Sequence, residues 1–247
     1  MDGIWFWAVA VVASVLVGMG KGGLPVVGMM GVPVLSLAIS PIAAAGLLLP
    51  VYVLSDMFGL YAYRHAFDRR VLAIVVPGMM AGVAIGWATA HMVPEWAVTT
   101  LVGLIGGVFA VNALVRKPVD GPPHRAKIVP GLFWGTIAGF TSFVSHTGGP
   151  PYQVYTLPLR MTKTVFAGTA TIAFAIINAV KLVPYYALDQ LNPGNLKIAV
   201  LLMPPAAIAV FVGVRLVNWL PEKLFFRVVT WALLAVSVKL IWDGISA

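Results

Sequence analysis

Long apolar stretches, separated by short loops, run through almost the whole chain of 247 residues. Several exceed the ~20 residues that a helix needs to cross the hydrocarbon core of a bilayer. The pattern predicts ten apolar segments, over residues 4–19, 24–39, 42–63, 71–91, 96–115, 128–145, 150–159, 164–186, 195–217 and 222–243. Segment 150–159 is too short to cross a bilayer alone.

Two glycine-rich breaks interrupt this pattern, one near the start of each half of the chain. The first covers Gly18–Pro25 and the second Ser145–Pro151, with Gly22 and Gly148 at matching positions. Irregular backbone is tolerated at membrane depth only where it is buried in protein or lines a cavity. Matched breaks in two matched halves therefore predict one central binding site.

Other residues repeat between the halves at nearly constant offsets. The pairs are Asp56 with Asn178, Pro77 with Pro204, Gly86 with Gly213, and Pro94-Glu95 with Pro221-Glu222. Each half holds five segments, an odd number, so the second half is inserted upside down relative to the first. Chance similarity among apolar helices rich in glycine and proline is the alternative explanation of these matches.

The predicted fold is therefore an all-α polytopic membrane protein built from two inverted repeats of about five segments each. Short, broken, re-entrant-like helices are expected at the glycine-rich motifs. Residues 1–117 would form the first transmembrane repeat, 118–127 a cytoplasmic linker and 128–247 the second transmembrane repeat.

Composition supports a membrane protein and excludes other classes. The chain is 60% hydrophobic and 10% charged, whereas a soluble domain has roughly 25% charged residues. It has no cysteine, which excludes disulfides and thiolate metal sites. The formal charge of +8 does not indicate nucleic-acid binding, because the basic residues form no continuous stripe.

The basic residues instead predict an orientation. With alternating crossings, twelve of the sixteen lie on one side: Arg64, Arg69, Arg70, Arg116, Lys117, Arg125, Lys127, Arg160, Lys163, Arg215, Lys223 and Arg227. The positive-inside rule makes that side cytoplasmic. We therefore expect a multi-pass protein of the cell (inner) membrane with both termini outside the cytoplasm.

The motifs resemble those of the TauE/SafE sulfite exporter-like transporters, also called the toluene sulfonate uptake permease family. The resemblance is carried by Gly18-x-Gly20-x-Gly22-Gly23 followed by Pro25, by Gly148-Gly149-Pro150, and by Ser40-Pro41 before the third segment. It implies transport of small sulfur-containing or organic anions such as sulfite, sulfonates or sulfoacetate. The chain departs from the family pattern at Leu24, where many relatives have a third glycine.

The breaks supply candidate groups for binding an oxyanion. Backbone N–H groups at Gly20, Gly22, Gly23, Gly148 and Gly149, with the N-terminal ends of half-helices, would provide donors and positive potential. The alternative is that these glycines only permit close helix packing.

Side chains near the breaks add further candidates. Lys21 is the best charge partner for a substrate, unless it snorkels to the cytoplasmic interface. His146 could donate to an anion or titrate, or it could be a neutral structural histidine. Thr147 offers a hydroxyl and Asn178 an amide to the same site.

Two further ionisable residues lie inside predicted segments. Asp56 could form an ion pair with Lys181 or with Lys21, or it could bind a coupling proton. Intramembrane ionisable residues are functional candidates by default, so both Asp56 and Lys181 are included in the expected site.

The predicted function is secondary anion export by alternating access between the two halves. A negative charge that leaves a negative interior gains about 2.3 kcal/mol per 100 mV, so efflux needs no coupling ion. Proton-coupled anion uptake and an anion channel are the alternatives.

An enzyme is disfavoured, because the four histidines (His65, His91, His124 and His146) are spread through the chain. We expect no catalytic residues, no metal and no cofactor. The expected partners are a small anionic substrate and the lipid bilayer, and the oligomeric state is left open.

Overall fold

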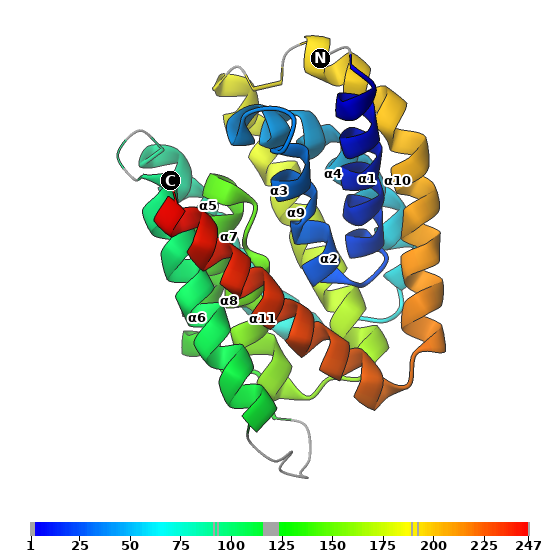
Figure 1. Cartoon of the computed structure of the whole chain (residues 1–247). Helices are drawn as coiled ribbons and strands as arrows, with labels where there is room; N and C mark the ends of the chain where they lie inside the picture. Colours follow the sequence, from blue (N-terminus) through cyan, green and yellow to red (C-terminus); the bar gives the residue numbers. More distant parts are fainter. Residues whose placement is uncertain are drawn as a thin grey trace. The chain divides into compact units, whose positions relative to one another are not determined.

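The computed structural model describes residues 3–90, 92, 94–115, 124–188, 190–191 and 193–246, and these contain helices but no strand. The predicted linker residues 118–123, together with Arg116, Lys117 and His91, lie outside the described residues. The helices are α1 (Ile4–Lys21), α2 (Pro25–Met29), α3 (Gly31–Leu35), α4 (Pro41–Tyr63), α5 (Arg69–Ala88), α6 (Glu95–Val115), α7 (Ile128–Ser145), α8 (Gly149–Thr156), the 3₁₀ helix η1 (Leu157–Leu159), α9 (Lys163–Ala187), α10 (Pro193–Trp219) and α11 (Glu222–Ser246) (Figure 1).

Seven of the described helices are long and apolar enough to cross a membrane: α1, α4, α5, α7, α9, α10 and α11. A shorter apolar stretch, Thr99–Val115, forms most of α6. The prediction of an all-α, multi-pass membrane protein is confirmed. The described boundaries follow the apolar segments closely, because a helix satisfies all its own backbone groups in hydrocarbon.

Segment 24–39 is interrupted, as expected for short, broken helices at the first glycine-rich motif, although the apolar pattern alone gave one segment there. It forms two helices of five residues each, α2 and α3, which meet at Met30. Pro33 explains the interruption, because it has no N–H to donate to the carbonyl of Met29 and its ring would crowd that carbonyl. Neither helix is long enough to cross a bilayer.

Polar residues cap two of the long helices at their starts. The Ser40 hydroxyl accepts a hydrogen bond from the Ala43 N–H at 3.4 Å, immediately before Pro41 opens α4. The Asp68 carboxylate accepts one from the Val71 N–H at 2.9 Å at the start of α5. These caps satisfy N–H groups that have no partner within the helix.

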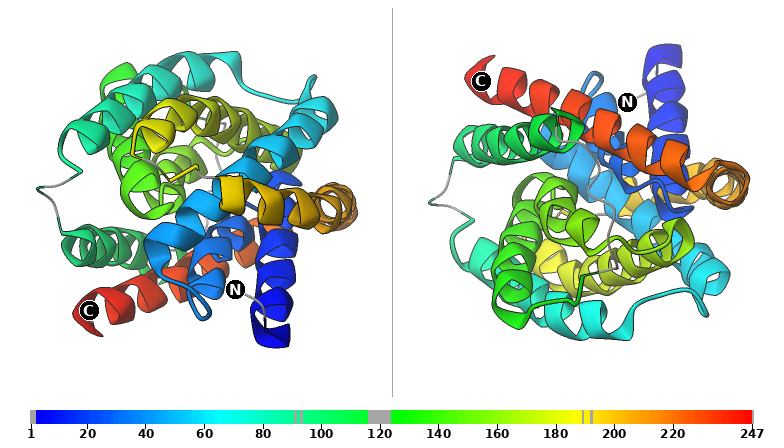
Figure 2. Two further views of the ribbon diagram at one scale, coloured as in Figure 1. Left: turned by 90° about the horizontal axis from the view of Figure 1, so that it is seen from above. Right: turned by 90° about the horizontal axis from the view of Figure 1, so that it is seen from below.

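The chain packs as two compact units. Unit 1 comprises Met1–Phe67 and Ala167–Trp219, and unit 2 comprises Asp68–Phe166 and Leu220–Ala247. In unit 1, α1 packs against α10, α4, α2 and α3. In unit 2, α5 packs against α7, and α6 packs against α11, α7 and α8. Figures 1 and 2 show α6 (green) and α11 (red) side by side in every view.

Glycines permit the close approach of one helix pair in each unit. In unit 1, Gly18 of α1 and Gly22 directly after it lie against the backbone of α10 at Ala206 and Gly213. In unit 2, Gly82 of α5 lies against Thr136 of α7, and Gly139 of α7 lies against Met79 of α5. A side chain at these positions would collide with backbone, so small residues are what let the helices approach.

These two packed helix pairs correspond to each other in the predicted repeat. If α1 corresponds to α7 and α10 corresponds to α5, then the pair α1–α10 in unit 1 has its counterpart in the pair α7–α5 in unit 2. Each compact unit also takes helices from both halves of the sequence. The inverted repeat and the boundaries 1–117, 118–127 and 128–247 remain predictions.

Candidate functional site

The first break, in unit 1, is a glycine-terminated helix end. The chain turns at Gly23, which has φ +105°. Among the described residues, Gly23 is the one glycine with a positive φ. The Leu24 N–H donates to the Met19 carbonyl at 3.3 Å, and the Gly23 N–H donates to the Gly20 carbonyl at 3.2 Å. These bonds form a Schellman motif, which favours glycine at the left-handed position. The next helix, α2, begins at Pro25.

The other glycines of this break serve packing. A Cβ on Gly20 would collide with Gly28 of α2, and a Cβ on Gly22 would lie 2.7 Å from Gly213 Cα. The close-packing alternative therefore accounts for why glycine stands at both positions. A role for the N–H groups of Gly20, Gly22 and Gly23 in substrate binding remains a prediction.

The carbonyl groups at the break accept bonds from side chains of α4 and α9. Tyr63 donates from its hydroxyl to the Gly22 carbonyl at 2.6 Å, and Thr171 donates to the Lys21 carbonyl at 3.2 Å. Tyr52 donates to the Gly28 carbonyl at 2.7 Å. These bonds satisfy backbone groups that the helix end leaves without internal partners, which fixes the break in one conformation.

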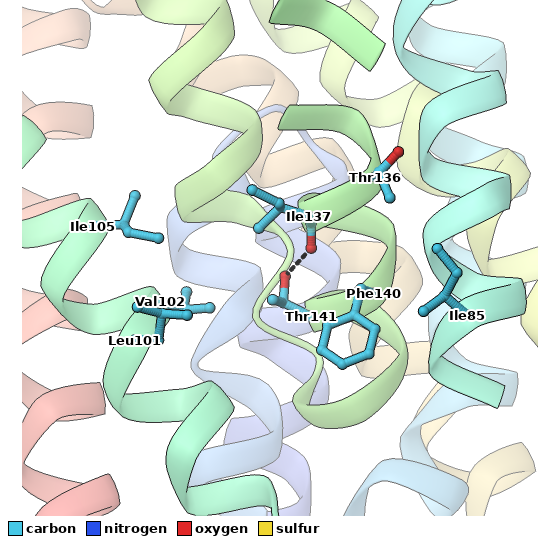
Figure 3. A pocket seen from close by; sticks show the side chains of 8 residues that line it. All are labelled: Ile85, Leu101, Val102, Ile105, Thr136, Ile137, Phe140 and Thr141. Atoms are coloured by element: carbon cyan, nitrogen blue, oxygen red, sulfur yellow. Dashed lines mark hydrogen bonds between the residues drawn. The ribbon is translucent and has the colours of Figure 1, made fainter. Parts of the chain in front are cut away.

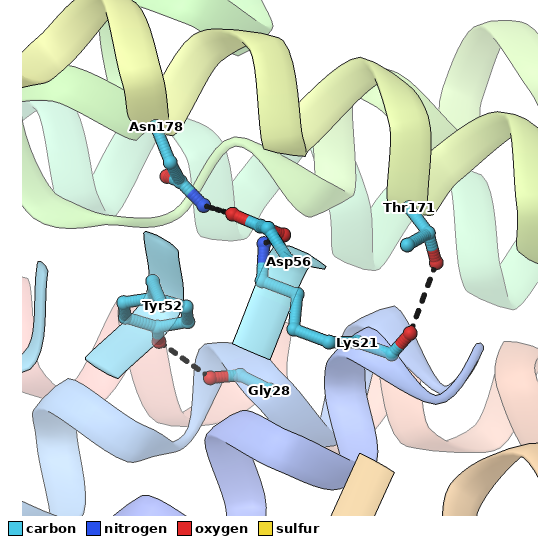
Figure 4. Close-up of polar contacts among 6 residues, drawn as sticks. All are labelled: Lys21, Gly28, Tyr52, Asp56, Thr171 and Asn178. Atoms are coloured by element: carbon cyan, nitrogen blue, oxygen red, sulfur yellow. Dashed lines mark hydrogen bonds and ion pairs between the residues drawn. The ribbon is translucent and has the colours of Figure 1, made fainter. Parts of the chain in front are cut away.

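A buried ion pair lies beside the first break (Figure 4). The Lys21 ammonium lies 2.7 Å from Asp56 Oδ1, and Asn178 Nδ2 donates to Asp56 Oδ2 at 2.8 Å. Lys21 and Asp56 are 6% and 3% exposed, so Lys21 does not snorkel to an interface. Its ammonium also lies 5.2 Å from the centre of the Tyr52 ring, within cation–π range.

Lys181 extends this buried set of residues in unit 1. It is fully buried on α9, three residues after Asn178 and therefore on the same face of that helix. Of the two partners that the sequence left open for Asp56, Lys21 makes the direct ion pair. We call Lys21, Asp56, Asn178 and Lys181 the buried polar cluster. It contains two lysines for one carboxylate.

The second break, in unit 2, is built differently. The helix α7 ends at Ser145, and the left-handed residue is His146, with φ 55°. The Thr147 N–H donates to the Thr141 carbonyl at 3.2 Å, which closes the end of α7. Gly148 has φ −68° and needs no glycine for its conformation. Histidine is among the residues enriched at positive φ.

Hydroxyl groups at the second break bond to one another and to nearby carbonyls. Ser145 Oγ and Thr147 Oγ1 lie 2.6 Å apart, and Ser145 also donates to the Thr141 carbonyl at 3.3 Å. Thr141 donates to the Ile137 carbonyl at 2.9 Å. His146 and Thr147 are both buried. The site predicted at His146, Thr147, Gly148 and Gly149 therefore includes hydroxyls that already have local partners.

The short helix α8 follows this break and returns beside α7. Tyr155, near its end, donates to the carbonyl of Lys127 at 2.9 Å, the residue immediately before α7. Gln153 is fully buried, and neither its Nε2 nor its Oε1 has a hydrogen-bond partner among the residues that the structure describes. The sequence reasoning missed Gln153, although a glutamine just after a break in an apolar segment was a visible signal.

An apolar pocket of about 220 Å³ lies in unit 2, between α5, α6 and α7 (Figure 3). Its polar lining residues are Thr136 and Thr141, and both donate their hydroxyls to carbonyls of their own helix. The remaining lining residues are aliphatic or phenylalanine. A pocket with this lining has no charge or spare donor for an anion, so we do not assign the substrate to it.

Among the described residues, no group of three histidines or carboxylates could hold a metal ion.

These features define a multi-pass, all-helical membrane protein with a buried ion pair beside one helix break and a polar second break. The chain belongs to the TauE/SafE family, because the family model described as Sulfite exporter TauE/SafE matches residues 5–240. That family consists of membrane transporters of the sulfite exporter type. Comparisons with curated proteins and with solved structures gave no match.

Proposed function

We propose that this protein is a secondary transporter that exports small sulfur-containing or organic anions, of the sulfite, sulfonate or sulfoacetate type, by alternating access. Membership of the sulfite exporter family supports the class of transporter and substrate. The proposal places the protein in the cell (inner) membrane with both termini outside the cytoplasm, as the basic loops indicate.

The buried polar cluster is the observation that carries the proposal. Its ionisable groups have a formal charge of +1, from Lys21, Lys181 and Asp56. Ionisable residues inside a membrane protein commonly mark substrate pathways, and the ammonium groups of this cluster are the positive groups that an anion would meet there. An ammonium has three N–H donors, and the bond to Asp56 uses one. The ion pair thus orients Lys21 and leaves donors for substrate oxygens.

The direction of transport follows from the charge of the substrate. An anion that leaves a negative interior is driven outward by about 2.3 kcal/mol per 100 mV. Export needs no coupling ion under these conditions, whereas accumulation inside would need one. Proton-coupled uptake is the second candidate, because Asp56 is a buried carboxylate whose protonation would release Lys21 to a substrate.

The test is flux in liposomes. Purified protein is reconstituted, loaded with sulfite or sulfoacetate, and held at an imposed potassium diffusion potential. We expect saturable efflux that accelerates when the interior is negative. Protein-free liposomes are the control. Absence of flux for every sulfur anion tested would overturn the proposal, and flux that requires a proton gradient would favour uptake over export.

A substitution at Lys181 tests whether the buried polar cluster binds the anion. Lys181→Met keeps the length and burial of the side chain but removes its charge, so the formal charge of the cluster falls to zero. We expect KM for the anion to rise about tenfold, on the order of one charge-assisted hydrogen bond. Unchanged KM would show that Lys181 does not contribute to anion binding.

A further inference from the structure

The N-terminus of α8 is short of backbone donors. The first turn of a helix ordinarily offers N–H groups that have no partner within the helix. In α8, however, Pro150 and Pro151 occupy the second and third positions and have no N–H. The next residue, Tyr152, donates its N–H to the Gly148 carbonyl at 3.2 Å. Of the first three positions, Gly149 alone carries an N–H.

One turn further along, Gln153 carries amide atoms without partners. Its side chain is fully buried, and both Nε2 and Oε1 lack a hydrogen-bond partner among the described residues. Buried polar groups in native proteins are nearly always hydrogen-bonded, so such a group needs a reason. Leaving it unpaired lowers stability, unlike a methionine or leucine at the same position.

Helix geometry directs this amide toward the second break. Side chains on a helix tilt toward its N-terminus, and residues four apart lie on one face. Gln153 therefore lies on the same face of α8 as Gly149, which has no side chain to cover that face. The Gly149 N–H and the Gln153 amide are thus the donors that this end of α8 can present together.

We infer that Gln153, together with the Gly149 N–H, binds an oxygen atom of the transported anion. This inference rests on the proposed function and adds a residue to it. A neutral amide donates hydrogen bonds to a sulfite or sulfonate oxygen without adding charge. It therefore compensates for the two N–H groups that the prolines remove.

The experiment uses the purified full-length chain and compares Gln153→Met with the wild type. Two quantities are measured: the thermal midpoint without ligand, and the Kd for sulfite and sulfoacetate from ligand-induced shifts of that midpoint. We expect Gln153→Met to keep or raise the ligand-free midpoint, because it removes an unpaired polar group. We expect its Kd to rise about tenfold.

Ser237→Ala is the matched control. Ser237 of α11 lies in the same unit, is fully buried, and its Oγ also has no hydrogen-bond partner among the described residues. It should change the ligand-free midpoint in the same direction and leave the Kd unchanged.

Three outcomes would overturn parts of the assignment. An unchanged Kd in Gln153→Met would exclude Gln153 as a ligand-binding residue while the proposed function stands. A clearly lower midpoint without ligand would show that the amide has a structural partner, which also overturns the inference. Absence of sulfur-anion flux and binding in the wild type would remove the proposed function itself, and with it the ligand assigned to Gln153.

Discussion

The two breaks each end a membrane helix with a backbone hydrogen bond, but they differ in geometry and in chemistry. The Leu24 N–H donates to the Met19 carbonyl, five residues back, and the Thr147 N–H donates to the Thr141 carbonyl, six residues back. The left-handed residue is Gly23 in the first break and His146 in the second. A buried lysine–carboxylate ion pair lies beside the first break, whereas a histidine, hydroxyls and an amide lie at the second.

This difference indicates a division of tasks within the proposed transporter. The first break would supply charge through Lys21, whose ammonium is paired with Asp56. The second would supply neutral donors from side chains, since the prolines of α8 leave few backbone N–H groups. Charge attracts any small anion, while directed neutral donors select by the geometry of its oxygen atoms. Loss of charge at the first break and loss of neutral donors at the second are therefore expected to have distinguishable effects.

The largest effect is expected from breaking the ion pair of the first break. Asp56→Leu leaves the Lys21 ammonium buried without its carboxylate, and removing one partner of a buried pair costs about 3–5 kcal/mol. The double variant Lys21→Met/Asp56→Leu removes both charges and should recover most of that stability. The free energy of unfolding in detergent, measured for the single and double variants, tests this coupling.

The exposed pair of Lys239 and Asp243 on α11 provides the control. Their charged atoms lie 2.7 Å apart, but both side chains are exposed. Asp243→Ala should therefore cost less than about 1 kcal/mol. If the effects of the substitutions at Lys21 and Asp56 on unfolding free energy were simply additive, the ion pair between them would not stabilise the fold.

The second prediction compares glycines of the two breaks. Gly23→Ala forces a left-handed conformation on alanine and places its Cβ against the Tyr63 hydroxyl, which bonds to Gly22. We expect a loss of about 2–3 kcal/mol in unfolding free energy. Gly148→Ala meets no such penalty, because its φ is −68°, and should cost less than about 1 kcal/mol. Equal losses at both positions would contradict the different construction of the breaks.

Hydropathy predicted most of the helices, because length and apolar character decide membrane crossing independently of tertiary contacts. It failed at segment 24–39, where composition is as apolar as elsewhere but Pro33 prevents one continuous helix. The interruption could have been predicted from Pro33, because its missing N–H leaves the Met29 carbonyl without a helical donor. The sequence therefore contained that information, although not in its hydropathy.

The candidate site was less predictable, because it depends on contacts between distant residues. The sequence placed Asp56 inside a helix but could not choose between Lys21 and Lys181, since that choice is made by the packing of α1, α4 and α9. The repeat offset did match Asp56 with Asn178, and the two residues are hydrogen-bonded in the structure. The position of Gln153 after a break was visible in the sequence, but only the structure shows that its amide lacks a partner among the described residues.

The smallest effect is expected at the hydroxyl pair of the second break. Thr147→Val removes the contact with Ser145, whose hydroxyl still donates to the Thr141 carbonyl. The loss should be about 1 kcal/mol in stability, and the Kd for sulfite should change less than about fivefold. Ser145→Ala is the matched variant, because it removes the other half of the same contact. A tenfold higher Kd in Thr147→Val, with the Kd of Ser145→Ala unchanged, would instead assign the Thr147 hydroxyl to substrate binding. The second break would then bind its anion through a side chain before α8 as well as through Gln153 within α8.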